Sequence, residues 1–402
     1  MSTLLPTQQA FARDKNEVCG RQVALFCAFL LPVYKLLELP SILARFCEGD
    51  LLLPALLHYI GQFCVWLLVV LAVKWIGEKY QKTPLALLEE KLGKWTAVIY
   101  IAYAICYLFY AALPLLDLEK FVYAAFYDTA PTFFTFAFFF PLCGYVCAKG
   151  LKCMGRCADI CLFLFTVPFT VLLAMSVFQA DFTGLLPLFE KDFSATKSAF
   201  LYSTPHFLDV FLCLPLIGNL RYQKGDGKKL SFGYLGGAAF SLLFLAVFYG
   251  IFSTTAPRQH YAFLKIAQYF PALSVVGRID LIFVYILSAV LFFFTCAPLL
   301  YATYLFTRSV SLFKKTPFVQ PDFPLDLHTD SLQKALAALI SIAAFFFTLF
   351  MNKHYDGVYA LFGGLYPLFW IVGSLLPLLF LVLAPKPSNN EKREKSTRKK
   401  GE

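Results

Sequence analysis

Charged residues are scarce in this 402-residue chain. Asp, Glu, Lys and Arg together make up 15% of it, whereas hydrophobic residues make up 59% and phenylalanine alone occurs 46 times. Soluble domains carry roughly a quarter charged residues, so the composition excludes that class. It indicates an integral membrane protein instead.

The sequence also lacks the patterns that mark enzymes and metal proteins. No Cys-x-x-Cys pair occurs among its 12 cysteines, and most of them fall inside apolar stretches, where cysteine behaves as a small hydrophobic residue. We interpret the closely spaced Cys143, Cys147, Cys153 and Cys157 as helix-packing thiols. Because no nucleophile-base set, phosphate loop or metal cluster is recognisable, we predict no enzymatic activity, no cofactor and no metal site.

Long apolar stretches dominate the chain instead. A hydrocarbon core of about 30 Å needs roughly 20 apolar residues per helix. Ten stretches satisfy this length, which predicts an all-α polytopic membrane protein with ten transmembrane helices. The predicted spans are approximately 22–46, 51–76, 95–117, 131–148, 157–179, 200–219, 230–253, 279–307, 332–352 and 358–384.

Basic residues predict the orientation of these helices. Most of the 35 Lys and Arg residues fall on the side shared by both termini, which the positive-inside rule assigns to the cytoplasm. We expect residues 1–21 to be a cytoplasmic segment without a cleavable signal peptide, residues 22–384 the transmembrane domain and residues 385–402 a basic cytoplasmic tail. That tail suits anionic lipid, and nucleic-acid binding is not expected because no aromatic platform accompanies it. The predicted outer loops are more acidic, and one of them starts at Asp117 and Glu119.

Two of the ten stretches, the first and the sixth, contain proline beside ionisable residues in mid-span, at residues 31–40 and 203–209. A helix that breaks inside lipid leaves backbone N–H and C=O groups without partners, which is costly. Helices one to five and six to ten then form two sets of five, and the second set inserts upside down. The two breaks meet near the bilayer midplane, where half-helix ends offer N–H groups and carbonyls to a small zwitterion.

The residues at these breaks are the candidate ligand groups. Lys35 lies too far inside the first stretch to be outside the membrane, so its charge must be paired or hydrated. It is either a fixed cation, which holds a ligand carboxylate or replaces a coupling sodium ion, or a structural partner of Glu38. Asp209 and His206 either bind an ammonium or relay protons, or they form a polar pair between helices. The predicted ligand-binding residues are Tyr34, Lys35, Glu38, Thr204, Pro205, His206 and Asp209, with Tyr107 and Tyr285 as wall residues.

Four motifs, taken in order, resemble a known family. They are Thr83–Trp95, Tyr145–Gly150 followed by Arg156 and Asp159, Thr183–Glu190, and Gly277–Asp280. Together they make residues 20–383 similar to the B subunit of spore germination nutrient receptors, a permease-like subunit of endospore-forming bacteria. The resemblance implies the amino acid, polyamine and organocation transporter fold, a LeuT-like 5+5 inverted repeat in which helices one and six are unwound around the ligand.

Three functions are compatible with these observations. The resemblance implies a germinant receptor subunit that senses a small nutrient, such as an amino acid or a sugar, in the spore inner membrane beside an A-type membrane subunit and a C-type lipoprotein. The same site would also serve a proton-coupled amino acid permease that works by alternating access. A scaffold or channel-forming subunit with a vestigial pocket is the third.

Overall fold

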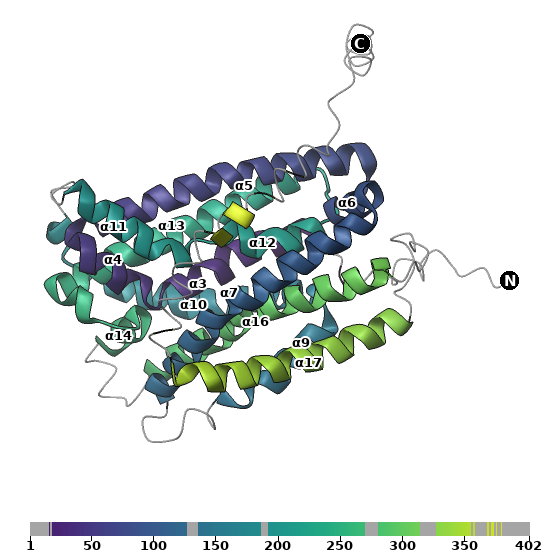
Figure 1. Cartoon of the computed structure of the whole chain (residues 1–402). Coiled ribbons are helices and arrows are strands. Elements are labelled where there is room, and N and C mark those ends of the chain that lie inside the picture. Colours follow the sequence, from purple (N-terminus) through teal and green to yellow (C-terminus); the bar gives the residue numbers. More distant parts are fainter. Residues whose placement is uncertain are drawn as a thin grey trace, which may run out of the picture.

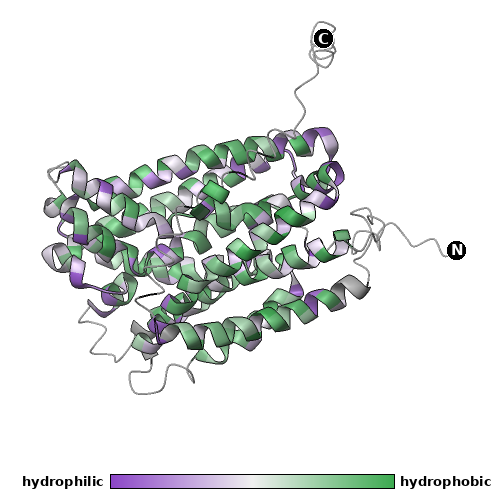
Figure 2. Cartoon of the chain, viewed as in Figure 1, coloured by the Kyte–Doolittle hydropathy of each residue, from purple (hydrophilic) through white to green (hydrophobic). Residues whose placement is uncertain are grey.

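A computed structural model describes Asn16, residues 18–126, 136–185, 192–269, 280–313 and 327–354, and scattered positions between 357 and 379. This described part is almost entirely helical (Figure 1). Its helices are apolar along most of their length (Figure 2). Six of the described helices are long and apolar enough to cross a membrane, or seven if the two bent halves of α10 form one span. The chain is therefore a multi-pass membrane protein.

The first half of the described chain begins with a helix in several pieces. Helix one consists of α2 (Gly20–Leu25), the π-helical η1 (Phe26–Leu30), α3 (Leu31–Lys35) and, after a break, α4 (Leu39–Cys47). The helices that follow are α5 (Leu52–Tyr80), α6 (Pro84–Leu92), α7 (Lys94–Phe126), α9 (Phe139–Lys149) and α10 (Leu151–Val177).

The second half repeats this order. Its first helix is again in pieces, namely α11 (Phe193–Ser203), η4 (Thr204–His206) and α12 (Asp209–Gly218). The helices that follow are α13 (Asp226–Phe252), α14 (Ala262–Tyr269), α16 (Asp280–Phe313) and α17 (Leu327–Asn352).

Corresponding helices of the two halves have similar lengths. The second helices, α5 and α13, contain 29 and 27 residues, and the third helices, α7 and α16, contain 33 and 34. Helix α7 packs along α16, and α9 packs along α17 (Figure 1). The predicted all-α membrane fold with broken helices one and six is confirmed.

Some predicted features fall outside the part of the chain that can be described. The tenth span, 358–384, lies almost wholly there, so the count of ten transmembrane helices stays a prediction. The cytoplasmic tail at 385–402 and most of the segment 1–21 also lie there, as do residues 186–191 and 270–279, which hold parts of two of the four motifs.

The boundary predicted for the third span was wrong. Helix α7 continues to Phe126, so Asp117 and Glu119 belong to the helix and are buried rather than lying in an outer loop. The Tyr34 hydroxyl donates a 2.6 Å hydrogen bond to Asp117 Oδ2. A carboxylate that faced lipid would be too costly to keep inside a span, but Asp117 faces the interior of the bundle, where Tyr34 donates a hydrogen bond to it.

The break in helix one follows from Pro40. In an uninterrupted helix the Leu36 carbonyl would accept the N–H of residue 40, and proline has none. The structure satisfies this carbonyl from outside: Phe263 N donates to Leu36 O at 3.1 Å, and Ala262 N donates to Leu37 O at 2.8 Å. The first N–H groups of α14, which have no partner within their own helix, thus pair with the carbonyls of the break.

The break in helix six is held by side chains of α5. Gln62 Oε1 accepts the Val210 N–H at 3.3 Å, near the start of α12. His58 Nε2 lies 2.8 Å from the Phe200 carbonyl near the end of α11. Two groups one turn apart on α5 therefore support both sides of the gap.

Two glycines bring α13 into backbone contact with the inner half of helix one. A Cβ atom at Gly233 would collide with the Ala24 carbonyl, and one at Gly237 would collide with the Cys27 carbonyl. The spacing of four residues is the small-xxx-small pattern that allows membrane helices to approach closely.

Candidate ligand site at the broken helices

A buried ion pair joins the two broken helices. Lys35 Nζ lies 2.8 Å from Asp209 Oδ1 and 2.7 Å from Oδ2, and each residue is only 2% exposed. Lys35 is the last residue of α3, and Asp209 is the first residue of α12. A cation at a helix C-terminus and an anion at a helix N-terminus both match the helix dipoles. The pair therefore occupies the positions that the sequence predicted for the charged groups of a zwitterion.

Polar and aromatic groups from neighbouring helices surround this ion pair. Tyr234 donates a hydrogen bond to Asp209 Oδ2 at 3.0 Å. Lys35 Nζ lies 4.6 Å from the centre of the Tyr59 ring and 4.7 Å from that of Phe207. Burying an ion pair is favourable only where such additional contacts compensate for lost hydration.

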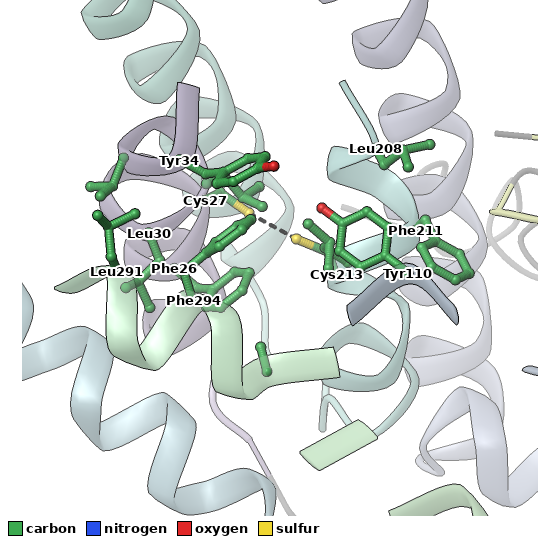
Figure 3. Packing of buried hydrophobic residues seen from close by; sticks show 14 of the residues in the cluster. Phe26, Cys27, Leu30, Tyr34, Tyr110, Leu208, Phe211, Cys213, Leu291 and Phe294 are labelled. Carbon is green, nitrogen blue, oxygen red and sulfur yellow. Dashed lines mark hydrogen bonds between the residues drawn. The ribbon is translucent and has the colours of Figure 1, made fainter. Parts of the chain in front are cut away.

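Tyr34 forms the outer neighbour of the ion pair. Besides its bond to Asp117, its ring stacks on His206 at 5.2 Å and on Phe294 of α16 at 5.1 Å between ring centres. Figure 3 shows Tyr34 and Phe294 on one side of the space between the helices and Tyr110 on the other. In the same view Cys27 faces Cys213 across the two broken helices, with 3.5 Å between the sulfur atoms.

Two buried polar atoms of this site, the Tyr59 hydroxyl and His206 Nδ1, make no hydrogen bond of good geometry among the described residues. Lys35 and Ser241 lie near the Tyr59 hydroxyl, and the Ser203 backbone lies near the His206 ring. An unsatisfied buried polar group costs about 1–3 kcal/mol. Both side chains contact the ion pair or Tyr34, so a small polar molecule in this region would satisfy them.

The structure brings most of the predicted residues together, but the partner of Lys35 differs from the one that the sequence suggested. Lys35 pairs with Asp209 rather than with Glu38, which immediately precedes α4 and accepts a hydrogen bond from Ser41 at its carbonyl. Thr204 and Pro205 form the 3₁₀ turn before the gap in helix six, where the Thr204 hydroxyl donates to the Phe200 carbonyl.

The two predicted wall residues lie elsewhere. Tyr107 stacks on Phe211 of α12 and donates to its carbonyl at 2.6 Å, so it supports α12 and does not touch the ion pair. Tyr285 is 61% exposed on α16 and faces away from the bundle. In a chain so rich in aromatic residues, residue type alone does not distinguish a wall residue from a lipid-facing one.

Sequence reasoning missed three polar residues of the site, Tyr59, Asp117 and Tyr234, and the apolar Phe207 and Phe294. Asp117 could have been recognised, because an ionisable residue within an apolar stretch indicates a function or a buried partner. The same argument identified Lys35. Tyr59 and Tyr234 carried no such signal. Their roles depend on the helix faces that α5 and α13 turn towards helix one.

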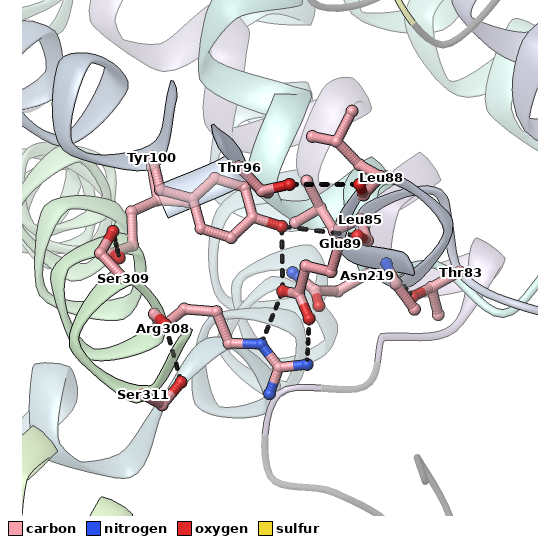
Figure 4. A network of polar contacts seen from close by, with 12 residues as sticks. Thr83, Leu85, Leu88, Glu89, Thr96, Tyr100, Asn219, Arg308, Ser309 and Ser311 are labelled. Carbon is pink, nitrogen blue, oxygen red and sulfur yellow. Dashed lines mark hydrogen bonds and ion pairs between the residues drawn. The ribbon is translucent and has the colours of Figure 1, made fainter. Parts of the chain in front are cut away.

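A second ion pair lies at the end of the bundle that holds α6 and that the charge pattern predicts to be the inner one (Figures 1 and 4). Its carboxylate is buried, and its guanidinium side chain is 31% exposed. Arg308 of α16 contacts Glu89 of α6 through Nε at 2.7 Å and through Nη2 at 2.9 Å. The Tyr100 hydroxyl donates to the same carboxylate at 3.0 Å. We call these three residues the inner polar network. It fastens the short helix α6 to α16, while α14 covers the break in helix one at the other end.

The geometry defines a class of protein. Two broken helices that begin the two halves of a repeated helix order, and that meet at a buried charge pair, characterise a LeuT-fold, permease-like membrane protein. Residues 59–355 match the family model described as spore germination protein. The chain belongs to this family of spore germination permeases.

Solved structures agree with this fold at low sequence identity. A Na⁺-coupled sialic acid symporter, in a substrate-bound outward-open state, is 12% identical with a TM-score of 0.54, over 89% of this chain and 78% of its own. A manganese transporter variant from Eremococcus coleocola is 13% identical with a TM-score of 0.54, over 93% of this chain and 82% of its own. No curated protein matches the chain in sequence.

Replacing Gln62 with leucine tests the support of the helix-six break. The substitution keeps the size of the side chain but leaves the Val210 N–H buried without an acceptor, so we expect a loss of about 1–3 kcal/mol in unfolding free energy. Chemical unfolding in mixed micelles measures it. Gln268→Leu on the exposed side of α14 is the control and should leave stability unchanged. Equal stability of both variants would show that the bond to Val210 contributes nothing.

Proposed function

We propose that this chain is the membrane subunit of a nutrient germinant receptor and that it binds a small zwitterion, such as an amino acid, between Lys35 and Asp209. The observation that supports this proposal is the ion pair across the ends of α3 and α12. When the ligand binds, Lys35 and Asp209 separate and each pairs with one charged group of the ligand. Its carboxylate binds Lys35, and its ammonium binds Asp209.

The environment of the pair favours such an exchange. The ligand carboxylate replaces Asp209 as the partner of Lys35, and the ligand ammonium replaces Lys35 as the partner of Asp209, so no charge in the site is left uncompensated. The Tyr59 hydroxyl and His206 Nδ1 gain hydrogen-bond partners. The break carbonyls of Leu36 and Leu37 are already occupied by α14, which leaves Asp209 to bind the ammonium.

Ligand exchange also provides a signal. Without ligand, the Lys35–Asp209 pair holds the two half-helices together, and the ligand inserts between them. A few kcal/mol of preference for the separated arrangement is enough to shift the population from one state to the other. We propose that an A-type membrane subunit and a C-type lipoprotein receive this change in the spore inner membrane, with both termini of the chain in the cytoplasm.

A ligand screen on the full chain in lipid nanodiscs tests the proposal. Amino acids, sugars and nucleosides are added singly, and the apparent melting temperature is measured, because a ligand that binds the folded state raises it by mass action. We expect amino acids alone to raise it, and Lys35→Met to lose this response. The matched control is Lys228→Met, an exposed lysine of α13. A response to sugars or nucleosides that survives Lys35→Met would contradict the proposed site.

A proton-coupled amino acid permease is the alternative function. A buried titratable pair on a transporter fold is the observation that favours it, because a proton on Asp209 would release Lys35 during transport. Uptake of labelled amino acid into proteoliposomes under an inward proton gradient distinguishes the two functions. Uptake by this subunit alone would favour the permease, whereas binding without uptake would favour the receptor.

A further inference from the structure

Three cysteines converge in the bundle away from the broken helices. Cys143 and Cys147 lie one turn apart on α9, and Cys296 reaches them from α16. The Cys143 and Cys296 sulfur atoms are 3.2 Å apart, those of Cys143 and Cys147 are 3.9 Å apart, and all three lie within 4.8 Å of one another. All three side chains are fully buried. Cys153 and Cys157, which the sequence suggested as their neighbours, are not part of this cluster.

Two buried side-chain oxygen atoms lie beside the cluster. Gln333 Nε2 of α17 donates to the Cys147 carbonyl at 3.1 Å, while Gln333 Oε1 accepts no hydrogen bond from the described residues. The Ser341 hydroxyl faces the Cys143 thiol, and it lies 3.1 Å from the position that a Cβ atom on Gly144 would take. Contact among the three thiols leaves the Gln333 oxygen without a partner.

Three sulfurs in this arrangement match the demands of a soft metal. Thiolates select Zn²⁺ and Cu⁺. With metal–sulfur bonds of about 2.3 Å, three ligands around one ion are separated by about 4 Å. The Cys143–Cys147 separation of 3.9 Å matches that value and the Cys143–Cys296 separation of 3.2 Å is shorter, so small side-chain rotations that move Cys296 away from Cys143 would make room for an ion. Gln333 or Ser341 would supply a neutral oxygen as a further ligand.

We propose that Cys143, Cys147 and Cys296 bind one thiophilic d¹⁰ metal ion, Zn²⁺ or Cu⁺, and that this ion fastens α9 to α16. All three cysteines bind as thiolates, because the thiolate rather than the thiol is the metal ligand, and their three protons leave to solvent. The site then carries one negative charge with Zn²⁺ and two with Cu⁺. Burial within membrane helices therefore favours Zn²⁺, which leaves the smaller net charge.

A groove provides a path to the cluster. It has a volume of about 450 Å³, lies between α9 and α17, and Gly144 and Ser341 are among its lining residues. Lys334, also in its lining, lies near the start of α17, close to the predicted inner face of the membrane. The cysteines themselves do not line the groove and are fully buried, so an ion in the groove would pass between Gly144 and Ser341 to reach them.

Metal analysis of the full chain in nanodiscs tests this inference. Wild-type protein and the variants Cys143→Ser, Cys296→Ser and Cys106→Ser are dialysed against buffered Zn²⁺ or, under reducing conditions, Cu⁺, and bound metal is counted per chain. Cys106 lies on α7 outside the cluster and is the matched control. Co²⁺ serves as a spectroscopic probe for Zn²⁺, because its thiolate complexes absorb by charge transfer.

We expect one ion per chain and a Co²⁺–thiolate band in the wild type and in Cys106→Ser, and a loss of both in the other two variants. The metal that binds identifies the ion. In the wild type, the same metal should raise the apparent melting temperature, a readout that does not depend on how the variants fold. No bound metal and no thermal shift in the wild type, or equal binding in all four proteins, would overturn the inference.

Discussion

Replacing Asp209 with asparagine should abolish the ligand response and destabilise the protein by about 3–5 kcal/mol, because it leaves the Lys35 ammonium buried without a counter-charge. Asparagine keeps the shape of the side chain, so packing is preserved. Only the charge that compensates Lys35 is lost. Chemical unfolding in mixed micelles measures the stability, and membrane insertion should be unaffected because Asp209 lies inside the apolar span Phe193–Gly218.

Two further variants separate charge from hydrogen bonding at this site. Tyr234→Phe removes a single hydrogen bond to Asp209 and should cost about 1 kcal/mol. The double variant with Lys35→Met and Asp209→Asn contains no uncompensated charge, so it should recover much of the stability that Asp209→Asn loses. Stability losses that simply add in the double variant would show that the two residues do not depend on each other.

Replacing Arg308 with methionine should have the second large effect, a loss of about 3 kcal/mol, because it leaves the Glu89 carboxylate without its cation. The Glu89 side chain is 1% exposed and the Arg308 side chain is 31% exposed, so water takes the place of the guanidinium only in part. Helix α6 should then separate from α16, which proteolysis or hydrogen exchange of residues 84–92 measures.

A surface ion pair provides the control for Arg308. Arg21 contacts Asp159 at 3.1 Å, but its side chain is 71% exposed. Exposed pairs contribute about 0–1 kcal/mol, so Arg21→Met should leave both stability and exchange nearly unchanged. If the two arginine variants behaved alike, the inner polar network would have no structural role.

The fold was largely predictable because the membrane restricts it so strongly. Apolar length predicted helices, and proline beside ionisable residues predicted breaks within 31–40 and 203–209. The structure has them at 36–38 and 207–208. The end of the third span was not predictable. Asp117 looks like a loop residue until its partner Tyr34, 83 positions away in sequence, is known.

The site was predictable in its charges but not in its contacts. A lysine and an aspartate in apolar spans indicated a polar centre, yet the sequence favoured the near partner Glu38 over Asp209, which lies 174 positions from Lys35. Pairing across that distance depends on how the two repeats face each other. The same limit applies to the cysteine cluster, where nearness in the chain pointed to Cys153 and Cys157 rather than to Cys296.

The glycines at 233 and 237 determine how movement at the site can spread. At these two glycines no side chain separates the backbone of helix one from that of α13. The two helices therefore cannot rotate past each other, and they must move together as one rigid unit. The break after Lys35 is held separately, because the carbonyls of Leu36 and Leu37 accept hydrogen bonds from α14. A displacement that begins at Lys35 can therefore spread in two directions, along helix one and α13 together and through the break to α14.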